Sequence, residues 1–150
     1  MKTIFDQTIQ QQLIDRINSI NDSNKAHWGK MNLCQMLKHC TSWDEWMLGI
    51  NKPVYKQAFI GKLFGKMALN KLTKDESPLD RNTPTSKEFK IKDSECDIAA
   101  EKSKWTALIR QYSHYNNPGF IHIFFGKMTK EEVGVIAYKH ADHHLRQFGA

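Results

Sequence analysis

The chain has 150 residues, of which 40% are hydrophobic and 25% charged, a composition typical of a globular protein and not of a disordered or collagen-like one. This length predicts a single domain over residues 1–150, with a core large enough to need no stabilising crosslink. No run of about 18 apolar residues is present, which excludes a membrane-spanning helix. The start, Met1–Asp6, reaches an acidic residue too early for a signal peptide.

The net charge of +6 comes from one segment, residues 51–74, because the rest of the chain carries equal numbers of basic and acidic side chains. Such a patch attracts phosphate groups or an anionic membrane, or else it is the solvated face of a short helix. We favour the solvated face, because the segment has no arginine and base-reading chemistry relies on arginine. Neither nucleic acid nor a membrane is therefore expected as a partner. The segment contains no acid and six lysines: Lys52, Lys56, Lys62, Lys66, Lys71 and Lys74.

Helical periodicity dominates the first half of the chain. Apolar residues at helical spacing predict a helix over residues 3–20, with Asp6, three residues after Thr3, as its cap. A second helix is predicted from Asn32, where Gln35 has the capping-box spacing, to Gly49. The segment 52–72 is ambiguous, because its apolar residues recur every four positions while two glycines weaken a helix by about 1 kcal/mol each.

The second half is predicted to hold two more helices. After a polar loop to about residue 93, one helix extends over residues 94–115 and ends at the Asn-Asn-Pro-Gly sequence that follows. The last begins at Thr129, where Glu132 completes a capping box, and ends at Gly149. No strand pair is predicted. The fold class is thus all-α, a four-helix bundle with a long crossover connection between the second and third helices.

Three cysteines are present, Cys34, Cys40 and Cys96, an odd number without a Cys-x-x-Cys pair. We therefore expect reduced thiols in a cytoplasmic protein. Cys40 is expected to be a core thiol, since it is rotated about 100° from its neighbour His39 on a helix.

Histidines near the C-terminus carry the functional signal. On a helix, His140 and His144 lie about 40° apart and about 6 Å along the axis, so both can reach one metal ion. They also lie on the apolar stripe of the last helix, where a polar ring needs a partner. Asp142 is turned about 160° away from both, which argues against a His-x-Asp iron site. The alternative, that the two histidines are simply polar neighbours on one helix, stays open.

A third ligand has to come from another helix, and His39, at the edge of the second helix's apolar stripe, is the best candidate. Gln147 lies within about 60° of both C-terminal histidines, and Trp43 lies one turn beyond His39, so both are expected to border the same cavity. His122, in a loop, is expected to approach from an end of the bundle. Three neutral imidazoles leave the fourth position of a zinc ion open, as in catalytic sites, and nickel or iron accepts the same set.

Four stretches together are similar to the DinB/YfiT-like superfamily of metal-dependent four-helix bundles, and most similar to a branch that ends in a KHxDHHLRQFG-type motif. The resemblance implies a metal held by His39, His140 and His144, and a long link between the second and third helices. It also implies a possible homodimer, and an activity like that of superfamily members that are thiol transferases or isomerases using low-molecular-weight thiols. The stretches are Trp28–Met31, Gln35–Cys40, His122–Thr129 and Tyr138–Gly149.

Two hypotheses about function follow. The first is a metal-dependent transferase or hydrolase, which activates a thiol or water for transfer to a small electrophilic substrate. The second is a binding module without enzymatic activity, in which segment 51–74 holds an anionic partner. The first predicts an activity that a chelator abolishes, and nucleic-acid binding by the second would depend steeply on salt.

Overall fold

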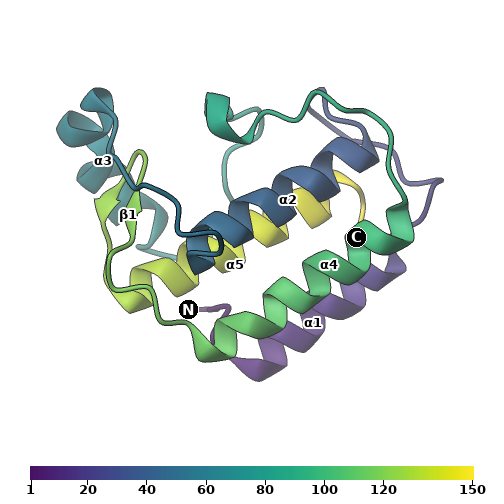
Figure 1. Cartoon of the computed structure of the whole chain (residues 1–150), viewed down its shortest axis with the longest axis horizontal. Helices are drawn as coiled ribbons and strands as arrows, with labels where there is room; N and C mark the ends of the chain where they lie inside the picture. Colours follow the sequence, from purple (N-terminus) through teal and green to yellow (C-terminus); the bar gives the residue numbers. More distant parts are fainter.

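The structure, a computed structural model, describes residues 1–150 and consists mainly of helices (Figure 1). Its elements, in chain order, are α1 (Gln7–Ser19), α2 (Leu33–Leu48), α3 (Phe59–Leu72), the short 3₁₀ helix η1 (Lys87–Phe89), α4 (Ile98–Gln111), a second 3₁₀ turn η2 (Tyr112–His114), β1 (Ile121–His122), β2 (Gly126–Lys127) and α5 (Lys130–Gln147).

Four helices, α1, α2, α4 and α5, form the bundle. Helix α2 packs against α4 and α5, and α1 packs against the same two helices (Figure 1). Their apolar stripes meet in one core, which confirms the helical bundle predicted from periodicity. None of the helices combines the length and the apolar composition that crossing a bilayer requires. Core residues with almost no exposed surface include Leu13, Ile17, Met36, Leu37, Met47, Trp105, Ile109, Ala137 and Leu145.

The predicted helix starts are correct for α2 and α5. Asn32 accepts a hydrogen bond from the backbone N–H of Gln35, whose side chain returns one from the Asn32 N–H, and Thr129 and Glu132 do the same. For the first helix, the start predicted at Thr3 is wrong by one turn, but the predicted cap is correct: Asp6 is the residue before α1, and its side chain accepts from two backbone N–H groups.

Two elements differ from the prediction. The ambiguous segment 52–72 forms a fifth helix, α3, which lies outside the bundle and packs on β2 (Figure 1). The chain also contains a strand pair that was not predicted, β1 and β2, because the pair is only two residues long on each side and has no alternating pattern to recognise. Both elements lie at the same end of the molecule.

A buried polar pairing ties α2 to α4. The carboxylate of Asp44 accepts hydrogen bonds from Trp105 Nε1 at 2.8 Å and from the Tyr112 hydroxyl at 2.6 Å. Burial raises the pKa of Asp44 to about 7, and the two donors act against that rise. Asp44 therefore serves the contact between these helices.

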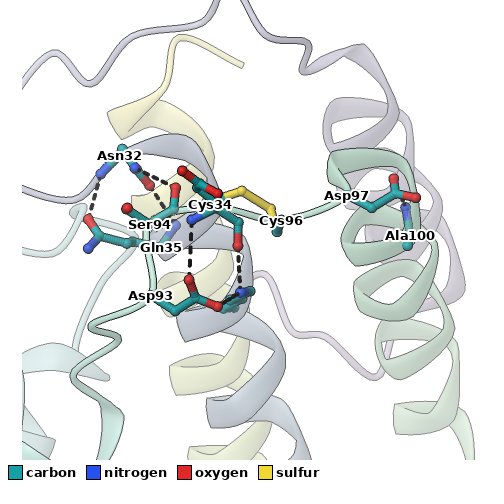
Figure 2. The surroundings of a disulfide bond; sticks show 10 residues. Asn32, Cys34, Gln35, Asp93, Ser94, Cys96, Asp97 and Ala100 are labelled. Atoms are coloured by element: carbon teal, nitrogen blue, oxygen red, sulfur yellow. Dashed lines mark hydrogen bonds and ion pairs between the residues drawn. A yellow bond between two sulfur atoms is a disulfide. The ribbon is translucent and has the colours of Figure 1, made fainter.

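The expectation of three reduced thiols is wrong. Cys34 and Cys96 form a disulfide, with Cα atoms 5.7 Å apart, and only Cys40 is free (Figure 2). The two positions are 62 residues apart in sequence, so spacing alone gave no indication of the contact. They meet because the connection before α4 lies along the first turn of α2, where Asn32 donates to the carbonyl of Ser94 at 2.9 Å (Figure 2). The cytoplasmic expectation loses the support it drew from reduced cysteines.

The disulfide leads to a prediction. Denatured, unreduced protein is expected to show one reactive thiol per chain, and three after reduction. The double variant Cys34→Ser/Cys96→Ser should lose about 2–4 kcal/mol of unfolding free energy in urea, because the bridge closes a long loop in the unfolded chain. Wild type under a reductant is the matched control and should lose a similar amount. Three reactive thiols before reduction would contradict the bridge.

Candidate metal centre

Three histidines from two helices face one small volume. His39 comes from α2, and His140 and His144 come from successive turns of α5, so the packing of α2 on α5 brings the rings together. The ring centroids lie 4.7–5.1 Å apart. One ligand atom from each ring lies within 4.8 Å of the others. The three histidines that the sequence predicted to share a site therefore lie close enough together to hold a metal ion.

Hydrogen bonds determine which ring nitrogen is unprotonated in His39 and in His144. His39 Nδ1 lies 3.0 Å from the carbonyl oxygen of Phe89, which only accepts, so this nitrogen carries the proton. His144 Nδ1 lies 2.9 Å from Gln147 Oε1, which again accepts. Both rings therefore offer an unprotonated Nε2. This is the usual way in which a partner of the outer nitrogen orients a metal-binding histidine.

The orientation of the Gln147 amide is itself set by its surroundings. Its Nε2 donates to the carbonyl oxygen of Trp28 at 2.7 Å, so its Oε1 must be the atom that faces His144. Gly29 makes room for this contact: it adopts φ +80°, and an added Cβ would come within 2.6 Å of Gln147 Nε2. The short connection between α1 and α2 thus determines the tautomer of a ring on α5.

Trp43 and His140 lie face to face, with ring centroids 4.0 Å apart and an interplanar angle of 16°. The indole ring therefore forms one wall beside the histidines, as expected, and limits rotation of the imidazole. His140 Nε2 lies 3.1 Å from His39 Nε2. Since the His39 atom carries no proton, either His140 donates to it or both nitrogens direct lone pairs at a shared cation. Two imidazole nitrogens bound to one tetrahedral zinc ion lie about 3.3 Å apart, close to the observed separation.

All three rings are held in the uncharged form that a metal requires. Burial lowers the pKa of His39, lowers that of His140 well below its usual value, and lowers that of His144 to about 3. His39 and His144 also lower the pKa of His140, and His39 lowers that of His144, because two adjacent positive charges repel. At neutral pH the cluster therefore presents lone pairs and no charge.

Other candidates are placed elsewhere. Asp142 pairs with Arg16 Nη1 at 2.7 Å, so it faces α1 and not the cluster, which confirms the argument against a His-x-Asp site. Cys40 is buried, and burial raises the pKa of its thiol, which fits a core residue. His27 and His114 are exposed.

His122 is buried in β1 and has a structural role in the hairpin. Its Nδ1 accepts backbone N–H groups from Phe124 and Phe125, both at 3.1 Å, and its ring stacks on that of Phe125. It is not part of the group of three ligands. Burial lowers its pKa to about 3, so the ring is neutral at neutral pH and its Nδ1 has the lone pair that these two bonds require.

Two groups that orient the histidines could not be identified from the sequence. They are the carbonyl oxygens of Phe89 and Trp28, which lie in connections far from the ligands in the chain. Every residue has a backbone carbonyl oxygen, so an acceptor of this kind cannot be recognised from the residue type. Gly29, which follows Trp28, gives a local indication of an unusual backbone conformation at this position, because a positive φ favours glycine.

The fold and this cluster define a helical bundle with three histidines close enough to hold a metal ion. The chain belongs to the family described as "Protein of unknown function (DUF1569)", whose family model matches residues 5–150. No curated protein and no solved structure matches the chain.

The lowered pKa of His122 leads to a pH prediction. Since the unfolded residue titrates near 6.5 and the folded one near 3, the unfolded chain binds this proton first. The stability that neutral His122 contributes is complete above pH 6.5 and is lost as the pH falls toward 3. In metal-free protein, the difference in unfolding free energy between wild type and His122→Asn should therefore fall by about 1.4 kcal/mol per pH unit between pH 6 and 4. If the unfolding free energies of wild type and His122→Asn changed with pH in parallel, His122 would be charged or exposed in the folded protein.

Proposed function

We propose that this protein binds a divalent metal ion, zinc before nickel or iron, through His39, His140 and His144, and that it is a metal-dependent enzyme. The observation that carries the proposal is the convergence of unprotonated ring nitrogens whose outer nitrogens are already hydrogen-bonded. His39 comes from a different helix than His140 and His144, and two of the three rings already have an acceptor on the outer nitrogen, as metal-binding histidines usually do. Neutral nitrogen donors suit zinc, and with three of them one position stays available to a further ligand.

When bound, such an ion lowers the pKa of a thiol or water at its open position and so supplies a nucleophile at neutral pH. The chain's own residues prepare the position for this ion. Phe89 and Gln147 hold two rings in the required tautomer, and Trp43 holds the third ring by stacking.

The reaction that fits best is transfer of a thiol or of water to a small electrophilic molecule. Two lines support this: the site lacks a carboxylate, which leaves no protein base at the cluster, and the sequence is similar to the DinB/YfiT-like superfamily. That resemblance covers the segments that carry all three ligands and Gln147. It makes a low-molecular-weight thiol the preferred co-substrate and a DinB-like connection the preferred description of the bundle.

Metal content gives the first test. Protein purified without chelator is expected to hold about one equivalent of metal, and His140→Ala should hold less than a tenth of that, because two nitrogens bind zinc much more weakly than three. His114→Ala, at an exposed histidine away from the cluster, should match wild type by elemental analysis. Equal metal in wild type and His140→Ala would remove the site.

Gln147 gives a second test, of positioning. Gln147→Leu keeps the volume but removes the acceptor for His144 Nδ1, so we expect zinc affinity to fall about 10- to 100-fold while the three ligands remain. Competition with a chromogenic chelator measures the change, and circular dichroism checks the fold. An unchanged zinc affinity would show that the hydrogen bond does not orient the ring.

Activity is tested with a thiol and a chromogenic electrophile. The rate with wild type should fall to that of the buffer after chelation and return when zinc is added. It should also be absent in His140→Ala. A rate that does not respond to the chelator would contradict a metal-dependent enzyme but would leave metal binding itself standing, so the two parts of the proposal fail separately.

A further inference from the structure

Helix α3 presents its smallest residues to the protein. An added Cβ at Gly61 or Gly65 would overlap the backbone carbonyl oxygen of Phe124, in the turn between β1 and β2, so both glycines lie directly on the hairpin. Leu69 is the other buried residue of this helix. With about 100° per residue, these three side chains fall within one sector about 80° wide.

The opposite face of α3 is apolar and points into solvent. Counted from Gly61, the large side chains fall between about 160° and 300°, which is the sector facing away from the hairpin. This is the reverse of an ordinary surface helix, whose apolar stripe faces the core. The exposed fractions are 77% for Phe59, 60% for Ile60, 62% for Leu63, 49% for Phe64 and 67% for Met67.

Lysines lie beside and within this apolar face. Lys62 and Lys66 lie along one border of it, and Lys71 lies within its sector near the end of the helix. Lys52 and Lys56 precede the helix in an extended connection that also carries Val54, which is 94% exposed. All are exposed, and residues 51–74 contain no acid. Only Lys66 has an acidic partner, Glu132 of α5 at 2.7 Å.

Charge decides which occupant this surface fits. A second copy docking on it through α3 would bring two acid-free sets of lysines together, and like charges disfavour that contact. An anionic bilayer offers both parts that the surface requires, phosphate groups for the lysines and an acyl boundary for the apolar side chains. At 14 residues, about 21 Å, the helix is too short to span and long enough to lie in the membrane plane.

We propose that α3 is an interfacial anchor, which places the protein on anionic membrane surfaces with Phe59, Leu63 and Met67 inserted at the headgroup–acyl boundary. This departs from the expectation, based on sequence alone, that the lysine segment is only a solvated face. Periodicity located the apolar residues but did not show that they point away from the protein. The anchor is independent of the metal centre, since α3 contributes no ligand to it.

Vesicle co-sedimentation tests the anchor. Wild type should sediment with vesicles of phosphatidylcholine and phosphatidylglycerol, and much less with phosphatidylcholine alone. Leu63→Ser/Met67→Ser should weaken the partition coefficient at least about tenfold, because two exposed apolar side chains are lost without touching the core. Lys56→Gln/Lys62→Gln should weaken it about fivefold per lysine. Lys25→Gln/Lys30→Gln, at exposed lysines on the α1–α2 connection, is the matched control and should bind as wild type.

Added salt should weaken binding to the anionic vesicles, because it screens the lysines. The proposal is overturned if wild type does not sediment with anionic vesicles, or if the α3 variants bind as well as wild type. It is also overturned if wild type forms a dimer that Leu63→Ser/Met67→Ser abolishes while no vesicle binding is seen, because the apolar face would then belong to a second copy. Metal content is expected to be the same in all these variants.

Discussion

Three imidazole rings share a volume in which burial disfavours a positive charge on each of them. Repulsion within the cluster lowers the pKa of His140 and His144 further, and the acceptors on the outer nitrogens of His39 and His144 leave both Nε2 atoms unprotonated. The rest of the structure can be understood from this constraint. Helices α2 and α5 must pack closely enough to bring the rings together. Two connections must each place one backbone carbonyl oxygen: that of Phe89 accepts from His39, and that of Trp28 orients Gln147, which accepts from His144.

The connection between α2 and α4 is the more elaborate of the two. It returns along α2, where Phe89 accepts from His39, Gln35 donates to the carbonyl of Ile91, and Lys38 donates to the carbonyl of Glu95. The disulfide between Cys34 and Cys96 fixes the end of this path (Figure 2). The bridge therefore stabilises the same segment that orients the ring of His39. At the far end of the molecule, α3 lies beside the hairpin (Figure 1). It packs there through its glycines and leaves its apolar face exposed.

Much of this could be predicted, because the signals were local. The capping boxes at Asn32 and Thr129 and the spacing of His140 and His144 follow from helix geometry alone, and the structure confirms them. His39 was the best candidate for a third histidine because it lies at the edge of an apolar stripe, and the structure brings it close to the other two. What could not be predicted depends on long-range contacts: the bridge between positions 62 residues apart, the acceptor carbonyl of Phe89, and the side of α3 that faces outward.

Anomalous diffraction at the zinc absorption edge, from crystals grown with one equivalent of zinc, tests the central claim most directly. The account predicts a single strong peak about 2.0–2.1 Å from the Nε2 atoms of His39, His140 and His144, with the Nδ1 atoms of His39 and His144 still bonded to Phe89 and Gln147. No peak between these rings, or a peak on other residues, would contradict it.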